Sequence, residues 1–312
     1  MNTPFLTTVI GSMPKPAWLF EPSLFHADNK DHHGSGSDWA FEGDLLRDAQ
    51  DDATRAAIHT QERIGLDIIS DGELRRKSYL TYITMRLQGF DYQTLAAKWI
   101  RDGRRLGQVG RCVGPVRRTA PILLEHLRFL LAEARTAVKV TLPGPMTVVD
   151  STYDNHYGDE RALAMDVAAA LNAEARELDA LGPAVIQFDE PVFSRYPEKV
   201  AAWGIEALDR CVDGLQAQTA VHICYSYPSP QLPRPIKPSY AAILQELNRS
   251  RIDQLALEFE APKLDPSLLQ HCPSKTVLFG CIDNGTTALE SPAAIAARLL
   301  AAAEYLPPSQ LQ

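Results

Sequence analysis

The hydrophobic positions of this chain fall into short runs of β-type residues, each followed by a longer stretch with helical periodicity. Residues 159–181 and 292–305, two of the longer stretches, are rich in Ala, Leu, Glu and Arg, which favour helices. Regular alternation of this kind is typical of βαβ units around a parallel sheet. The pattern predicts seven such units, with strands at residues 6–11, 66–70, 138–142, 184–189, 220–224, 254–258 and 276–283.

Polar residues recur where the predicted strands end. In a (β/α)8 barrel these positions all face one rim, where active sites are built. A polar residue at one strand end is well explained as a loop cap, but repetition along the chain favours a barrel with a functional rim. The residues are Ser12, Asp71 with Glu73, Asp189 with Glu190, His222 with Cys224, Glu258, and Asp283.

Two segments interrupt the alternation. Residues 23–41 are rich in Gly, Ser, His and Asp and predict a loop inserted after the first strand. Its adjacent His32 and His33 favour a solvated loop over a metal site, because neighbouring side chains seldom point at one ion. Residues 88–118 carry a basic run and predict a hairpin laid across the rim. No linker or repeat divides the chain, so we expect a single barrel domain over residues 1–312.

Composition and charge exclude several classes of function. With 312 residues and 45% hydrophobic content, the chain can bury a sizeable core. A net charge of −8 argues against a nucleic-acid surface. No run approaches the roughly 20 apolar residues of a membrane span, and the N-terminus lacks a secretory signal pattern, which predicts a cytoplasmic protein without membrane partners. The five cysteines stand at irregular spacing, as expected for reduced thiols.

His222 and Cys224 lie two positions apart in the predicted strand 220–224, so their side chains project to the same side. Zinc binds Cys sulfur, His nitrogen and carboxylate oxygen, and Glu258 stands at the end of the next strand. These three residues are candidate zinc ligands. From the spacing alone, a buried histidine and a small apolar cysteine in the barrel wall remain the alternative.

Seven sequence blocks carry a family resemblance. In chain order they are "TTVIGSMPKP", "IISDGELRRKSY", "GRCVGPV", "VKVTLPGPMT", "IQFDEPVF", "VHICYSY" and "LALEFE". They resemble the catalytic domain of cobalamin-independent methionine synthase, and most closely the short core members without the duplicated N-terminal barrel. The resemblance runs through nearly the whole chain. It implies a (β/α)8 TIM-like barrel in which zinc, without cobalamin, binds homocysteine as a thiolate that takes a methyl group to give methionine.

The resemblance also assigns residues to this chemistry. His222, Cys224 and Glu258 match the first three zinc ligands of the family. The homocysteine backbone and ammonium group are assigned to Ile10, Gly11, Ser12, Glu73 and Asp189. Simpler interpretations stay open for some of these: Gly11 and Ser12 could form a tight turn, and Glu73 could pair with Arg75 or Arg76.

The methyl-donor residues depart from the family pattern. Arg111 and Cys112 match a family contact to methyl-folate, but the tryptophan expected after "GPMTVVD" is Ser151. Where the family has an acidic residue, this chain has Arg195. Where the family has its proton-donating histidine, this chain has Gly285. Folate therefore loses its main stacking platform. We expect a donor other than triglutamated methyl-folate, or a simpler one-glutamate folate.

The segment "DSTYDNHY" at the rim end of the third strand offers candidates for the lost acid or for donor contacts. These are Asp150, Tyr153 and His156, although a polar loop ahead of a helix explains the segment equally well. Two other functions remain open at this stage. One is a zinc-thiolate alkyltransferase with another acceptor thiol, and the other is an inactive barrel acting as a binding subunit. Whether the chain forms a homodimer is also open.

The fourth zinc ligand of the family is a cysteine after the eighth strand, which is absent from the sequence up to Gln312. A barrel of seven strands would expose two unpaired edges, so we expect an eighth strand and helix, and this cysteine, beyond Gln312. Cys281 is the internal alternative. It lies within the seventh predicted strand, which favours a packed core residue over a ligand.

Overall fold

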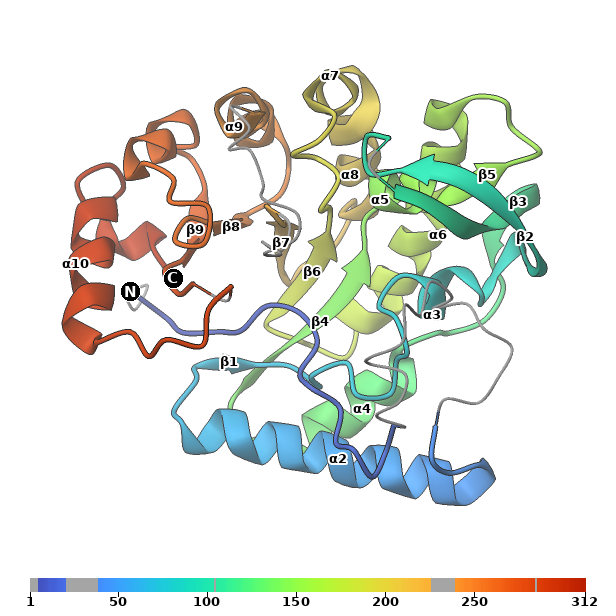
Figure 1. Cartoon of the computed structure of the whole chain (residues 1–312), viewed down its shortest axis with the longest axis horizontal. Helices are drawn as coiled ribbons and strands as arrows, with labels where there is room; N and C mark the ends of the chain where they lie inside the picture. The colour runs from blue at the N-terminus through green and yellow to red at the C-terminus, as the bar shows by residue number, and fades with distance from the viewer. Residues whose placement is uncertain (1–4, 21–38, 104, 226–238, 284) are drawn as a thin grey trace.

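A curled parallel sheet forms the centre of the molecule. The computed structural model describes residues 5–20, 39–103, 105–225, 239–283 and 285–312. Six strands pair in parallel in the order β1 (Ile68–Ile69), β4 (Ala137–Pro143), β6 (Val185–Asp189), β7 (Gln218–Ile223), β8 (Gln254–Glu258) and β9 (Thr276–Gly280). Figure 1 shows the sheet curving around a central axis. The predicted α/β barrel architecture is confirmed.

The two ends of the curled sheet are linked through the chain termini. Thr8 forms a parallel bridge with Ile68, and Leu311 forms one with Val277. Phe5 N donates a hydrogen bond to Leu311 O at 2.9 Å, so the segment around Phe5 lies between β1 and the C-terminal residues (Figure 1). The strand predicted at residues 6–11 is thus reduced to a single bridge at Thr8. We expected the eighth strand beyond Gln312, but Leu311 and Gln312 already pair with β9 at that position.

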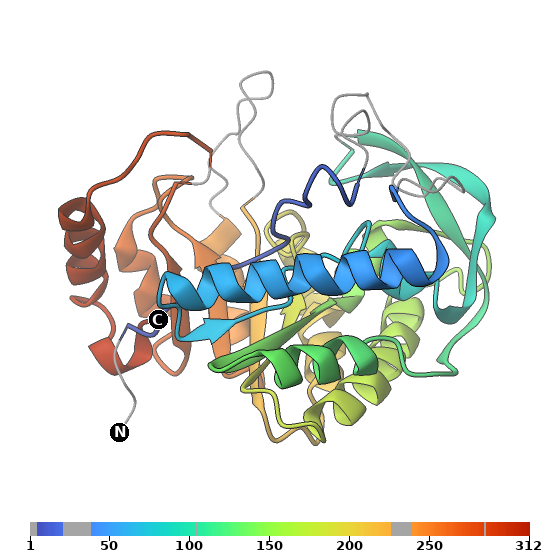
Figure 2. The ribbon, with the colours of Figure 1, turned by 90° about the horizontal axis from the view of Figure 1, so that it is seen from below.

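Helices cover the outside of the sheet (Figures 1 and 2). Helix α6 begins where the Asp159 carboxylate accepts from Arg161 N and Ala162 N, and it buries Leu163, Leu171 and Leu178. The helices predicted at 159–181 and 292–305 correspond to α6 and α10. The α-helices are α2 (Gly43–Arg63), α3 (Thr81–Thr84), α4 (Leu124–Glu133), α5 (Pro145–Asp150), α6 (Glu160–Asp179), α7 (Pro197–Lys199), α8 (Ile205–Cys211), α9 (Ser239–Arg249) and α10 (Pro292–Ala302). Short π or 3-10 turns cover Val200–Gly204, Pro266–His271 and Pro308–Gln310.

A separate three-stranded sheet projects from the barrel. Strands β2 (Leu87–Ile100) and β3 (Arg105–Arg118) form an antiparallel hairpin, and β5 (Thr152–Asp154) pairs in parallel with β3. The hairpin occupies the segment 88–118 for which we expected one (Figure 2). The predicted loop at 23–41 lies mostly outside the described residues, and His32 and His33 with it.

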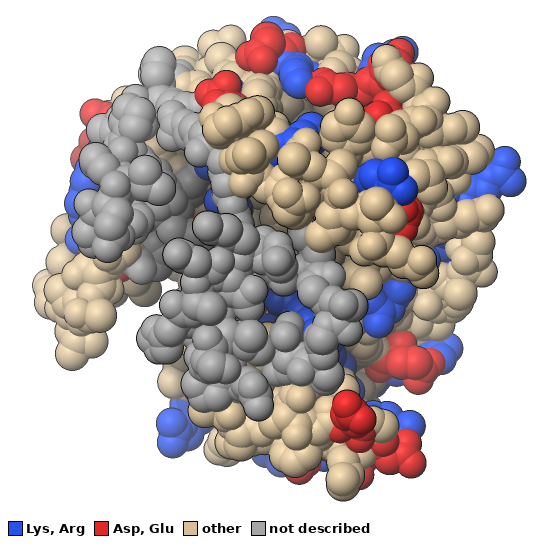
Figure 3. All heavy atoms as spheres, turned by 45° about the vertical axis from the view of Figure 1, so that its right-hand side comes forward, with Lys and Arg blue, Asp and Glu red and all other residues tan. Residues whose placement is uncertain are grey.

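Surface charge and helix hydrophobicity can be described for the part of the chain that the structure covers. On the face shown in Figure 3, acidic and basic side chains of the described residues are interspersed, without an extended basic area. Among the helices in the described ranges, none combines the length and apolar character required to cross a membrane.

Candidate functional site

The carboxyl ends of β6 and β7 open into a cavity of about 380 Å³. The loops that follow Thr8 and β1 contribute to one part of its wall, and α5 and the β2–β3 hairpin contribute to another. Residues predicted to bind the substrate line it together with two of the predicted zinc ligands: Gly11, Ser12, Glu73 and Asp189, with His222 and Cys224. This cavity at the strand ends is the candidate active site.

His222, Cys224 and Glu258 form a metal-type group at the edge of this cavity. One ligand atom from each of the three side chains lies within 4.8 Å of the other two. His222 Nε2 is 4.0 Å from Glu258 Oε1. The arrangement follows from the strands, because β7 and β8 are adjacent, His222 lies near the end of β7 and Cys224 is the first residue after it.

The donor set of this group fits zinc. Ligand bonds of about 2.0–2.3 Å place the ligand atoms of a tetrahedral site roughly 3.3–3.8 Å apart, close to the spacing seen here. His222 Nδ1 lies 3.1 Å from Asp189 Oδ1. A carboxylate on one ring nitrogen, with the other nitrogen facing the ligand group, is the usual arrangement of metal-binding histidines.

Cys281 stands apart from this group. The metal-type group found within the described residues contains His222, Cys224 and Glu258 only. The Cys281 carbonyl accepts from Arg298 Nη1 at 2.8 Å, and burial raises the pKa of its thiol. The fourth ligand that we expect beyond Gln312 lies outside this sequence and stays a prediction.

The Glu73 carboxylate is held at the cavity wall by two hydroxyl groups. Ser12 Oγ donates to Oε2 at 2.5 Å, and Thr141 Oγ1 donates to Oε1 at 2.9 Å. Gly11 has a φ of 81°, a left-handed conformation that turns the chain sharply and directs Ser12 toward Glu73. A tight turn at Gly11 and Ser12 is therefore present and lies within the cavity wall.

The arginines after Glu73 do not form a close ion pair with it. Arg75 Nη2 pairs with Asp51 at 2.5 Å, while Arg76 Nη1 is 3.9 Å from Glu73 Oε1. Arg76 instead donates to Thr141 O at 2.9 Å. The Glu73 carboxylate thus keeps contact with the cavity.

The predicted donor residues are only partly brought together. Asp150, Ser151 and Arg195 line the cavity. Arg111 pairs with Asp91 at 2.7 Å, and the buried Cys112 thiol lies 3.4 Å from Gly114 O. The predicted site residues outside the cavity lining are Ile10, Arg111, Cys112, Tyr153, His156, Glu258 and Cys281.

Sequence reasoning missed an aromatic residue and the way Asp150 is held. Tyr79 lines the cavity, and burial raises the pKa of its phenol far above the usual range. Asp150 accepts from Tyr196 Oη at 3.0 Å and from Arg101 N at 3.1 Å, which attaches the hairpin end to α5. Tyr79 is the last residue of the block "IISDGELRRKSY", which also contains Glu73. Its place in this block was the signal that the sequence offered.

Glu190 lies outside the cavity lining and binds the backbone at the start of α5. Its carboxylate accepts from Met146 N at 2.8 Å and Thr147 N at 2.9 Å, at the start of α5. A Cβ at Gly144 would lie 2.2 Å from Glu190 Cδ, so only glycine fits there. Burial raises the pKa of Glu190 to about 8.

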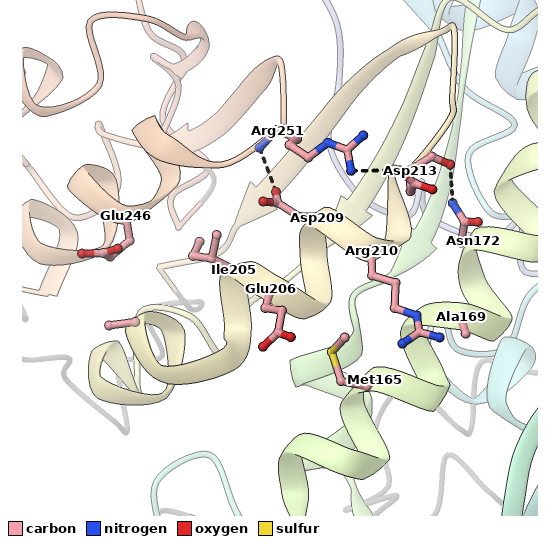
Figure 4. Close-up of a pocket in the computed structure, with 11 residues that line it drawn as sticks. Met165, Ala169, Asn172, Ile205, Glu206, Asp209, Arg210, Asp213, Glu246 and Arg251 are labelled. Atoms are coloured by element: carbon pink, nitrogen blue, oxygen red, sulfur yellow. Dashed lines mark hydrogen bonds and ion pairs between the residues drawn. The ribbon is translucent and has the colours of Figure 1, made fainter.

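A larger cavity of about 840 Å³ lies on the outside of the barrel between α6, α8 and α9 (Figure 4). Three of its charged residues contact one another: Arg251 pairs with Asp213 at 2.9 Å, and its backbone N–H donates to Asp209 at 2.8 Å. It contains no cysteine or histidine in its lining. The cavity at the strand ends therefore carries the candidate chemistry.

The fold and the site define a barrel enzyme with a metal-type group beside a small-molecule cavity at its strand ends. Residues 5–312 match the family model of the cobalamin-independent synthase catalytic domain. The chain therefore belongs to that family, and it is a methyltransferase of the methionine synthase type. The predicted family resemblance is confirmed.

Individual relatives support this assignment. The chain is 28% identical to the methionine synthase of Sulfurisphaera tokodaii over 306 residues, covering 98% of this chain and 83% of the relative. It is 28% identical to that of Thermococcus kodakarensis over 314 residues, covering 100% and 86%. The solved structure of a B12-independent methionine synthase from Shewanella sp. W3-18-1, in complex with selenomethionine, superposes with a TM-score of 0.90 at 35% identity, covering 99% of this chain and 89% of that one.

Proposed function

We propose that this protein transfers a methyl group to the thiol of homocysteine, forming methionine, with zinc held by His222, Cys224 and Glu258. The observation that carries the proposal is the convergence of these three side chains within 4.8 Å beside the cavity, in a chain of this family. The related Shewanella enzyme is in complex with selenomethionine, the selenium analogue of the proposed product.

The zinc site and the cavity have separate tasks. The chemistry that zinc supplies at such a site is deprotonation of the substrate thiol, whose pKa is otherwise about 8.5. The protein's own contribution is to place the sulfur in line with the methyl carbon. As the sulfur–carbon bond forms, the bond between that carbon and the donor breaks, and the donor keeps the electron pair.

Glu73 and Asp189 are proposed to bind the ammonium group of homocysteine. Both carboxylates line the cavity and both are buried, so a cation between them gains a charge-assisted hydrogen bond from each. The turn at Gly11 and Ser12 lies beside Glu73 and is proposed to hold the carboxylate end of the amino acid. This pair of acids distinguishes an α-amino acid acceptor from a simple thiol.

The methyl donor is proposed to bind between α5 and the hairpin. Asp150, Ser151 and Arg195 line that part of the cavity. Ser151 offers no aromatic face, and Arg195 offers no acceptor for the N–H groups of a pterin. We propose a donor other than triglutamated methyl-folate, with Asp150 as a contact to it.

The test compares zinc content and methionine formation in His222→Ala, Cys224→Ser and Glu258→Ala. We expect each variant to lose most of its zinc and its methionine formation. Cys281→Ser is the matched control, because this cysteine lies outside the metal-type group, and it should keep both. Normal zinc and turnover in all three site variants would exclude the proposed ligands.

A further inference from the structure

Two polar side chains are buried inside the barrel beneath the site. Lys139 on β4 is 2% exposed, and Gln187 on the adjacent strand β6 is 0% exposed. Lys139 Nζ donates to Gln187 Oε1 at 3.1 Å. A lysine enclosed in this way loses hydration, and burial lowers its pKa to about 8. The fold therefore keeps a costly polar residue where an apolar one would pack more favourably.

The Lys139–Gln187 contact continues to the metal-type group. Gln187 Nε2 donates to Asp189 Oδ1 at 2.8 Å. The same oxygen lies 3.1 Å from His222 Nδ1, and the opposite ring nitrogen of His222 faces Glu258. An unbroken series of hydrogen bonds thus runs from Lys139 to the imidazole ring.

The chemistry of the groups fixes the direction of each bond. A lysine ammonium only donates, so the Gln187 amide must turn its oxygen toward Lys139 and its NH2 group toward Asp189. A carboxylate only accepts, so His222 must carry its hydrogen on Nδ1. The lone pair of Nε2 is then directed at the metal-type group.

We propose that Lys139 is a positioning residue that acts through Gln187 to hold Asp189 and to fix the tautomer and orientation of the His222 ring. The ring orientation stands on the hydrogen bonds alone. Its consequence for metal binding rests on the proposed function. Lys139 is not among the residues that line the cavity, and its Nζ donates its hydrogen bond to Gln187 and not to one of the three ligand residues.

Replacement of Lys139 by methionine removes the donor and keeps a side chain of similar length. The Gln187 oxygen then loses its donor, so the amide is held by one of its two hydrogen bonds only. We expect Gln187 to hold Asp189 less firmly, and Asp189 in turn to hold the Nδ1 side of the His222 ring less firmly. Loss of a partner behind a metal ligand typically costs about 10–100-fold in metal affinity. We expect Lys139→Met to weaken cobalt and zinc binding by about tenfold.

Lys275→Met is the matched control. Lys275 is also buried, at 6% exposure, and its Nζ donates to Ser250 O and Ile252 O, apart from the Lys139–Gln187–Asp189–His222 series. This variant should lose stability but keep the metal affinity of the wild type. It separates loss of a buried lysine in general from loss of this particular hydrogen bond.

The experiment measures metal affinity by chelator competition, the visible spectrum of the Co²⁺ form, and the 15N NMR shifts of His222 in the metal-free protein. Gln187→Met tests the same bonds from the other partner, and it serves if Lys139→Met fails to fold. If Lys139 acts through Gln187, Lys139→Met should cost little further affinity in the Gln187→Met background. The wild type should show hydrogen on Nδ1, and both variants should lose this preference.

Unchanged His222 shifts together with unchanged affinity in Lys139→Met or Gln187→Met would overturn the inference. Fully additive losses in the double variant would show that Lys139 does not act through Gln187. A wild type that binds neither zinc nor cobalt would overturn the proposed function, and the NMR shifts would still decide the inference.

Discussion

Ser12 Oγ and Glu73 Oε2 lie 2.5 Å apart although the two residues are 61 positions apart in the chain. The contact joins the turn at Gly11 to the loop after β1 and sets one wall of the cavity. It places a buried carboxylate in the cavity wall, where we propose that the ammonium group of homocysteine binds.

Glu73→Gln tests this wall. The amide keeps the shape and can still accept from Ser12, but it lacks the charge that attracts an ammonium group. We expect the KM for homocysteine to rise about 10–100-fold, corresponding to roughly 1.4–2.8 kcal/mol, with zinc content unchanged. Steady-state kinetics at a fixed donor concentration measures the effect. Asp283→Asn, in the segment after β9 and outside the cavity lining, is the control. An unaltered KM in Glu73→Gln would contradict an α-amino acid acceptor.

Lys139 is expected to give the stability a pH dependence in the alkaline range. Its pKa is about 8 in the folded protein and 10.5 as the reference value. Below pH 8 the lysine is charged in both states, and the full cost of burying the charge applies. As pH rises from 8 toward 10.5, the unfolded chain binds more protons than the folded one, so the stability rises.

Lys139→Met lacks this rise. The free energy of unfolding of the wild type should therefore gain up to about 3 kcal/mol relative to Lys139→Met between pH 7.5 and 10.5. Urea unfolding at several pH values measures the difference. Parallel curves for the two proteins would show that Lys139 does not change its protonation between the folded and unfolded states in this range.

Ser151 tests the choice of methyl donor. We expect the wild type to turn over triglutamated methyl-folate poorly at micromolar concentration. Ser151→Trp restores an aromatic face in the cavity wall, and stacking on such a face is typically worth ~1–3 kcal/mol. The KM for this folate should fall by about one to two decades.

Tyr153→Trp is the matched control for this change, because Tyr153 lies outside the cavity lining. It should leave the KM unchanged. Efficient use of triglutamated methyl-folate by the wild type would refute the proposed donor preference. It would also indicate that Tyr79, the aromatic residue already in the lining, provides the platform.

The parts of the fold that follow from local periodicity were predictable from the sequence. The strand at 254–258 coincides with β8, and the others agree within a few residues, apart from the first, which is reduced to a bridge at Thr8. The proximity of His222, Cys224 and Glu258 followed from strand alternation and the order of neighbouring strands. The strand predicted to run to residue 283 ends at Gly280, where the close approach of Leu257 O leaves no room for a Cβ.

Features that depend on register between distant segments were not predictable. The hairpin has register shifts between Gln88 and Phe90 and between Asp91 and Ala96, and such shifts change which side chains face the barrel. As a result Gln108 and Val109 line the cavity, whereas Arg111 does not. The Lys139–Gln187 contact likewise depends on the pairing of β4 with β6, which no local pattern specifies.

We propose that homocysteine binds through its sulfur, and its selenium analogue through selenium, at a zinc ion held by His222, Cys224 and Glu258. X-ray absorption at the zinc edge, recorded with and without L-selenohomocysteine, tests it most directly. The proposal predicts that a selenium neighbour of zinc appears when the analogue is added to the wild type and to Cys281→Ser. A zinc coordination shell that stays unchanged when the analogue is bound would contradict it.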